Sequence, residues 1–295
     1  MGHGAGGKLR ARRDSGHAAL SWKPVLLAGL AALAVFIAAV LTKTPRHDRD
    51  WVEHLSVTPK IRRDGDAWQV SPVRDWRYDG DGPVAREWIE GARLDPERLQ
   101  RVWLMVEPHP GLDIMAHTLV LFEFQEAGMI GLTIEARREK GETYDPLRGA
   151  LGRFELIYVW ATPRDLLTRR VVHLDHEVYL YRLELTPGEA RAYLTSLLQR
   201  TAAIEVRPRF YNTLTSNCTN ELAKSGGLAW HPAFILTGGA ARALHARGRI
   251  AGADFDAVKA SANMTETVRA LSAEPPERFN AALLERLRPG AGEGR

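Results

Sequence analysis

Cys218 is the only cysteine in a chain of 295 residues, and its neighbours favour a reactive thiol. It stands in YNTLTSNCTNEL (211–222), where hydroxyl and amide side chains precede a segment with the composition of a helix. Asn217 or Ser216 can cap that helix, and Glu221 falls in its first turn. A thiol at a helix N-terminus meets free N–H groups and the positive end of the dipole, which lower its pKa. The alternative is a buried cysteine that acts as a small hydrophobic side chain.

A thiolate nucleophile needs a base, and His117 is the best placed of the ten histidines. It opens HTLVLFEF (117–124), whose alternation predicts a strand, and a rigid sheet suits an oriented base. A histidine satisfied in the core would have the same local sequence. His173 and His176 have the spacing of a metal pair, but no third ligand is nearby, so we predict neither a metal site nor a cofactor.

The apolar run PVLLAGLAALAVFIAAVLT, residues 24–42, predicts a single transmembrane helix. At 1.5 Å per residue it covers about 28 Å, close to the thickness of the hydrocarbon core. Basic residues precede it, whereas Asp48 and Asp50 offset those that follow, so the N-terminus is expected in the cytoplasm. A cleavable signal peptide would have a shorter apolar core and an exit of small residues.

The expected organisation is that of a single-pass protein of the inner membrane with its domain in the periplasm. The net charge is +4, but the one basic cluster lies at the extreme N-terminus and no basic stripe carries interleaved aromatic residues, which argues against nucleic-acid binding. We predict a cytoplasmic basic tail, a transmembrane anchor, a membrane-proximal segment that begins the domain, and a periplasmic catalytic domain, over residues 1–23, 24–42, 43–85 and 86–290.

The rest of the chain predicts an α+β domain with an antiparallel sheet and flanking helices. A Thr186–Glu189 capping box, with Pro187 at the first position, begins a helix that runs to about residue 203. Asp95 and Pro96 have the same kind of signal and predict a helix through 99–105. Further helices are expected from Cys218, near 233–247 and around 277–288. Alternating or continuous apolar segments predict strands at 117–124, 130–138, 154–161 and 177–185, with a short strand in AWQVSPV (67–73).

Several segments together resemble the N-terminal periplasmic domain of Lnb-type lipoprotein N-acyltransferases, a bacterial family. The likeness covers roughly residues 50–250. The characterised acyltransferases carry further membrane helices after this domain, and none is predicted here, which leaves the lipoprotein substrate open. The segments that carry the resemblance are RDWRY (74–78), AHTLVLFEF (116–124), TIEARREKGETY (133–144), FELIYVWATPRDLLTRR (154–170), VYLYRLEL (178–185) and YNTLTSNCTNEL (211–222).

The resemblance implies that Cys218 and His117 are the catalytic pair. Their order, histidine before cysteine, is similar to that of permuted papain-like enzymes of the NlpC/P60 and lecithin:retinol acyltransferase type. In such enzymes a polar group on the next strand orients the histidine, and Glu135 is the candidate here. The alternative for Glu135 is a salt bridge with Arg137 or Arg138.

The expected activity is that of a membrane-anchored, cysteine-dependent acyltransferase that acts on acyl esters of membrane lipids or lipoproteins. A thiolate beside a histidine attacks an ester or amide carbonyl and forms a thioester. The same pair would serve an NlpC/P60-like amidase or peptidase of the cell wall. A membrane-tethered binding module with an inert thiol is the third alternative. The oligomeric state and any partner protein are left open.

Overall fold

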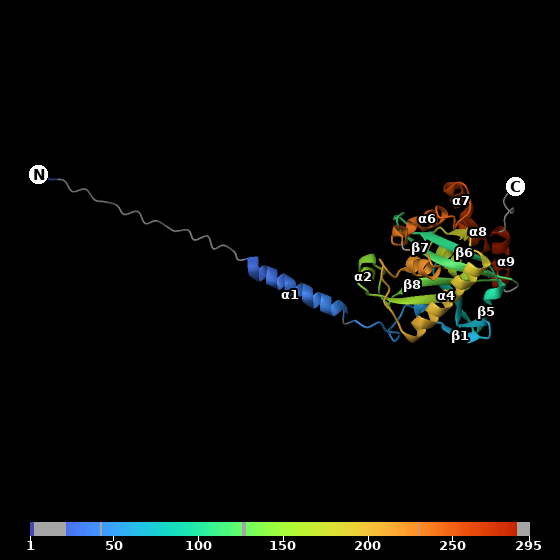
Figure 1. Ribbon diagram of the computed structural model, residues 1–295, viewed down its shortest axis with the longest axis horizontal. Coiled ribbons are helices and arrows are strands. Elements are labelled where there is room, and N and C mark those ends of the chain that lie inside the picture. The colour runs from blue at the N-terminus through green and yellow to red at the C-terminus, as the bar shows by residue number, and fades with distance from the viewer. Residues whose placement is uncertain (3–21, 42, 126–127, 230, 288–295) are drawn as a thin grey trace. The chain divides into compact units, whose positions relative to one another are not determined.

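The structure is a computed structural model, and it divides the chain into two compact units, residues 1–44 and 45–295. The first unit contains helix α1, Trp22–Leu41 (Figure 1). Most of the predicted cytoplasmic tail, residues 3–21, lies outside the described residues. The structure describes residues 1–2, 22–41, 43–125, 128–229 and 231–287.

The predicted membrane anchor, residues 24–42, falls on α1, but the side chains of residues 36–42 are outside the described part of the chain. Among the residues that the structure describes, no helix combines the length and the apolar character needed to cross a membrane. The anchor therefore stays a prediction.

A mixed sheet of seven strands forms the centre of the second unit, in the order β10-β6-β7-β8-β9-β3-β4. Neighbouring strands are antiparallel except β3 and β9, which pair in parallel. The predicted α+β class is confirmed, whereas a purely antiparallel sheet is wrong at this pair. The strands are β3 Val73–Tyr78, β4 Pro83–Ile89, β6 Leu99–Pro108, β7 Ala116–Phe124, β8 Gly128–Arg137, β9 Glu155–Ala161 and β10 Tyr179–Arg182.

The segment predicted as membrane-proximal, residues 43–85, contributes strands to the folded unit. A small antiparallel sheet contains β1 Lys60–Asp64, β2 Ala67–Ser71 and β5 Ala92–Leu94. From β1, Arg62 forms a two-point ion pair with Glu205 of helix α4, Pro187–Val206, at 2.8 and 2.9 Å. This segment is therefore part of the domain's packing.

The helix predicted from Asp95 through residue 105 is wrong. Asp95 does cap, since its side chain accepts from Glu97 N–H, but only the short 3-10 helix Pro96–Arg98 follows. β6 then begins at Leu99 and lies between β7 and β10. A local capping signal cannot outweigh the burial of a strand that has partners on both sides.

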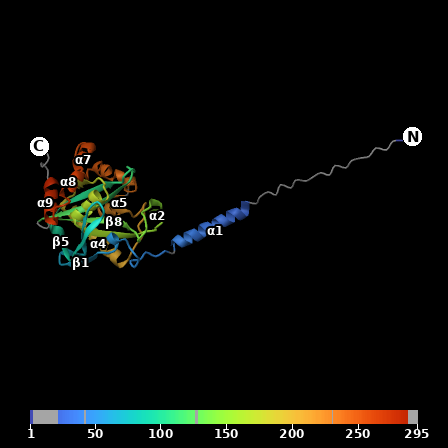
Figure 2. The ribbon, with the colours of Figure 1, turned by 180° about the vertical axis from the view of Figure 1, so that it is seen from behind.

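Helices cover both faces of the large sheet, and successive side chains of β7 point alternately into the two cores that these helices form with it. Val120 and Phe122 point into one core with Leu194 and Leu198 of α4, while Leu121 points into the other. That second core contains side chains of α3, α8 and α9, of which α8 and α9 lie next to each other in both views (Figure 1, Figure 2). The helices are α2 Pro146–Ala150, α3 Pro163–Thr168, α4 Pro187–Val206, α5 Cys218–Ser225, α6 Ala240–His245, α7 Phe255–Ala262, α8 Thr265–Leu271 and α9 Pro276–Leu287.

Candidate active site

His117 and Cys218 line one cleft of about 370 Å³, together with Glu135. His117 is the second residue of β7, and Cys218 is the first residue of α5. Glu135 lies on the neighbouring strand β8. The fold therefore brings the predicted site residues together, although they are far apart in the sequence.

A fixed cap holds Cys218 at the start of α5. The Asn217 side chain accepts from Asn220 N–H at 2.8 Å, and its Nδ2 donates to the carbonyls of Thr213 and Phe234 at 2.8 Å each. Cys218 is 5% exposed. Its position next to the unpaired N–H groups of the first turn favours a negative charge on sulfur.

Glu221 fastens α5 to the sheet from inside. Its carboxylate accepts from Ser216 at 2.6 Å, from Tyr158 of β9 at 2.8 Å and from Arg209 at 3.0 Å. Burial raises the pKa of Glu221, but these hydrogen bonds and the charges of Arg209 and Lys224 lower it more, to about 2. The helix that positions the cysteine thus depends on one buried carboxylate.

The thiol and the imidazole favour an ion pair. Burial raises the pKa of Cys218, but the charge and hydrogen bond of His117, with hydrogen bonds from Thr118, lower it more, to about 7. Burial lowers the pKa of His117, but the charges of Glu135 and Cys218 raise it more, to about 10. Near neutral pH these shifts favour thiolate with imidazolium.

A short relay orients the imidazole. His117 Nε2 lies 2.7 Å from Thr133 Oγ1, and the Thr133 hydroxyl donates to Glu135 Oε1 at 2.8 Å. Nε2 is also 3.3 Å from that carboxylate oxygen. Because the hydroxyl donates its proton to Glu135, it accepts from Nε2–H, which leaves Nδ1 for the thiol.

Glu135 makes no ion pair with Arg137, which was one of its predicted alternatives. Arg137 instead donates to the carbonyls of Leu55 and Ser56. The arginine that does form an ion pair with Glu135 is Arg170, at 3.4 Å. Burial raises the pKa of Glu135, but His117, then Arg170 and Arg169, hold it well below its usual range.

Arg170 links Glu135 to a second acid, Glu107. Its Nε donates to Glu107 at 2.8 Å, and Glu107 also binds His176 Nδ1 at 2.6 Å. His173 and His176, whose spacing is that of a metal pair, thus have different surroundings, since the His173 ring stacks on Tyr78 with centroids 6.0 Å apart. Among the described residues, no cluster of three or more potential ligands could hold a metal ion.

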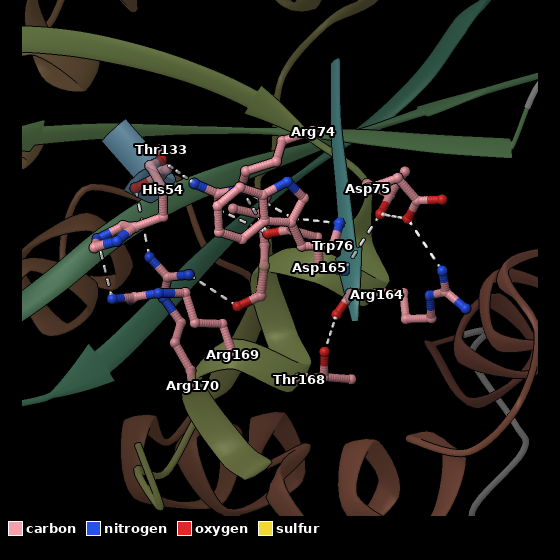
Figure 3. A network of polar contacts seen from close by, with 12 residues as sticks. His54, Arg74, Asp75, Trp76, Thr133, Arg164, Asp165, Thr168, Arg169 and Arg170 are labelled. Carbon is pink, nitrogen blue, oxygen red and sulfur yellow. Dashed lines mark hydrogen bonds and ion pairs between the residues drawn. The ribbon is translucent and has the colours of Figure 1, made fainter. Parts of the chain in front are cut away.

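Two Arg-Asp dipeptides, Arg74-Asp75 and Arg164-Asp165, pair crosswise, as Figure 3 shows. Arg74 forms a two-point ion pair with Asp165, at 2.7 and 2.9 Å. Arg164 lies 3.3 Å from Asp75, which also accepts from Thr162 at 2.6 Å. The crossing ties β3 to α3, the helix that leads into Arg169 and Arg170.

Thr118, Thr133 and Arg170 are site residues that the sequence analysis did not select. Thr118 follows His117, and the hydroxyls of Thr118 and Thr219 lie 2.9 Å apart. Thr133 could have been found, because alternation in β8 places it on the face of Glu135. Arg170 had no comparable signal, since it reaches the site from another segment.

The fold and the site define an α+β domain with a cysteine at a helix start and a histidine on a central strand. The model of one family, the Lnb N-terminal periplasmic domain, matches residues 86–236, just over half of the 295-residue chain. The chain belongs to this family, as predicted, and is thereby assigned a periplasmic domain. The matched range contains His117, Glu135 and Cys218. No curated protein and no solved structure was found to match.

Proposed function

We propose that this protein is a cysteine-dependent acyltransferase that acts on acyl esters of membrane lipids or lipoproteins. The observation that carries the proposal is that Cys218, at the start of α5, and His117, on β7, line one cleft. Their mutual charges lower the pKa of the thiol to about 7 and raise that of the imidazole to about 10. Such a pair supplies a nucleophile and a proton donor in one cleft.

The reaction runs in two halves. The Cys218 thiolate attacks the ester carbonyl, the ester C–O bond breaks, and His117 gives its Nδ1 proton to the leaving alkoxide. An acceptor amine or water then attacks the thioester, His117 takes a proton from it, and the thiolate leaves. Because the first N–H groups of α5 have no carbonyl partner within the helix, they can stabilise the oxyanion in each half.

An apolar cavity beside the pair supports a lipid substrate over a cell-wall peptide. It measures about 70 Å³, and Thr118 and Thr219, the chain neighbours of His117 and Cys218, lie in its wall. Most of its other lining residues are apolar, and they include Leu104, Leu183, Leu185, Leu222, Leu228 and Phe234. A cavity of this kind fits part of an acyl chain and has few polar groups that could bind a peptide.

We also propose that the domain has a permuted papain-like fold. A histidine strand that precedes the cysteine helix, with the orienting Glu135 on the next strand, supports a permuted papain-like arrangement of the NlpC/P60 type. Superposition of an experimental structure on such an enzyme would test it. The pairs Cys218–His117 and His117–Glu135 should overlap with the enzyme's catalytic groups.

We further propose that residues 24–42 anchor the domain in the inner membrane with the N-terminus in the cytoplasm. The uncharged run and the distribution of basic residues around it support this orientation. A reporter that is active only in the cytoplasm should be silent when fused at Arg295. Strong activity of that fusion would overturn the topology.

Mass spectrometry of the Cys218 peptide tests the activity directly. The full-length protein is incubated with a diacylglyceryl lipopeptide or a phospholipid, and a hydroxylamine-sensitive fatty-acyl mass on Cys218 is expected. Cys218→Ser, which is nearly isosteric, is the control and should form no thioester. Cleavage of cell-wall peptides without an adduct would favour the amidase alternative. Neither product, with slow alkylation, would leave an inert thiol.

A further inference from the structure

Two arginines in the catalytic cleft have no acidic partner among the residues that the structure describes. Arg74 is neutralised by Asp165 and Arg170 by Glu107, both through short ion pairs. Arg138 and Arg169 also line the cleft and are half-buried. Neither forms an ion pair with any residue in the part of the chain that the structure describes.

Within the described part of the chain, the side chain that hydrogen-bonds to Arg169 does not neutralise it. Arg169 Nη2 donates to His54 Nε2 at 3.2 Å, as Figure 3 shows. Burial first, then the charges of Arg169 and Arg74, and to a lesser extent that of Arg138, lower the pKa of His54 to about 2. His54 is therefore a neutral acceptor that holds the guanidinium in place.

The acids of the cleft are already engaged. Glu107 binds Arg170 and His176, and Glu135 is shared by Arg170, His117 and Thr133. Arg138 and Arg169 thus remain in the cleft of the nucleophile without an ion pair of their own among the described residues, although the charge of Glu135 acts on Arg169. Keeping such charges out of water costs free energy unless an anion pairs with them. Guanidinium groups suit a phosphate or a carboxylate, because their paired N–H donors match two oxygens.

We propose that Arg138 and Arg169 form an anion subsite for the phosphate of a glycerophospholipid, which serves as the acyl donor. The inference rests on the proposed acyltransferase activity and names its donor class. A phosphodiester carries a full charge and two free oxygens, one for each arginine. It also lies a few bonds from the ester carbonyl that Cys218 attacks. A neutral diacylglycerol would leave both guanidinium groups uncompensated.

Alkylation of Cys218 tests the subsite without any turnover. Glycerol 1-phosphate is added at fixed ionic strength, and the rate of iodoacetamide labelling is followed. Saturable slowing is expected in the wild type, because the bound anion covers the cleft and disfavours the thiolate. The slowing should vanish in Arg138→Gln/Arg169→Gln. The matched control is Arg153→Gln/Arg207→Gln, which also removes two positive charges, from exposed positions outside the cleft. Equal slowing in the wild type and the double variant would overturn the subsite.

Donor competition tests the assignment to a phospholipid. Phosphatidylglycerol and diacylglycerol with the same acyl chains are offered in identical micelles, and the acyl mass on Cys218 is followed over time. We expect the wild type to prefer the phospholipid by about tenfold or more, since charged hydrogen bonds reach this size. The double variant should lose the preference, so that its rates with the two donors become equal.

Equal wild-type rates from both donors would overturn the donor assignment. Protection by glycerol 1-phosphate or inorganic phosphate without donor preference would assign the subsite to a free anion and would likewise overturn it. If no donor acylates Cys218, the acyltransferase proposal fails, while the alkylation experiment still decides whether the arginines bind an anion.

Discussion

The imidazole of His117 and the carboxylate of Glu135 stand 3.3 Å apart, on neighbouring strands of the sheet. The hydroxyl of Thr133 bridges them, 2.7 Å from the ring nitrogen and 2.8 Å from the carboxylate oxygen. This arrangement fixes which ring nitrogen faces the thiol, and the acid also favours the charged form of the ring. Both consequences can be measured.

The pH dependence of Cys218 alkylation should show a thiol pKa of about 7. The sign follows from the lowered pKa, because reactivity is present above pH 7 and is lost as the pH falls through it and the thiolate is protonated. His117→Ala removes the charge and the hydrogen bond that lower this pKa, while burial still raises it. Labelling at pH 7 should then slow by about tenfold or more, since each pKa unit is a factor of ten in thiolate. His245→Ala, outside the cleft, should behave as the wild type.

Replacing Thr133 by Val should remove the hydroxyl bridge between His117 and Glu135 with little change in shape and leave only their direct contact at 3.3 Å. We expect the pKa of His117, raised to about 10 in the wild type, to fall, and Cys218 acylation to slow by about 10–100-fold, as for lost supporting hydrogen bonds elsewhere. Titration of the ring by NMR and the rate of acyl-adduct formation are the two measurements. Thr133→Ser should restore both. An unchanged His117 titration in Thr133→Val would show that the hydroxyl has no positioning role.

Glu221→Gln should destabilise the domain most at neutral pH. Removing a fully buried carboxylate weakens hydrogen bonds from Ser216, Tyr158 and Arg209, a loss of about 2–3 kcal/mol in the free energy of unfolding. The pKa of about 2 means that this stabilisation is complete above the unfolded value of about 4.3 and is lost as the pH falls towards 2.

Urea unfolding at pH 7 and at pH 3 measures this dependence. The difference between wild type and variant should be smaller at pH 3. Glu97→Gln, at an exposed ion pair with Arg191, should leave the unfolding midpoint nearly unchanged at both pH values. A constant difference for Glu221→Gln would mean that folding does not lower the pKa of its carboxylate.

The buried pair of Arg74 and Asp165 should show strong coupling in a double-mutant cycle. Arg74→Met leaves the carboxylate buried without its cation and should cost about 3–5 kcal/mol in urea unfolding. Arg74→Met/Asp165→Leu removes both charges and should cost clearly less than the sum of the single variants. Additive effects would contradict the pairing.

Local patterns predicted the parts of the fold that depend on neighbouring residues. The alternation in 117–124 gave β7 and its two faces, and the Thr186–Glu189 capping box gave the start of α4. Asn217 caps the helix that Cys218 begins. In each case the signal and the interaction lie within a few residues, so the sequence carries them directly.

Local sequence patterns do not predict contacts between distant segments of the chain. The Asp95 cap is real, yet β6 follows it because β7 and β10 pair with that segment. Arg170 contacts Glu135 from another part of the chain, and the crossed Arg-Asp pairs join segments about ninety positions apart. Periodicity reports which face of an element is buried, but not which element covers it.

The position of β3 sets a limit on where the protein can be shortened. The family match begins at residue 86, whereas β3, Val73–Tyr78, lies between β9 and β4 in the sheet and supplies Arg74 to Asp165. A fragment beginning at residue 86 would lack β3. The backbone edge of β9 would then be exposed, and the carboxylate of Asp165 would be buried without its cation. Unpaired edges of this kind recruit other chains. Such a fragment should be recovered in inclusion bodies, whereas one that begins at residue 45 should stay monodisperse, with its thiol as reactive as in the full chain.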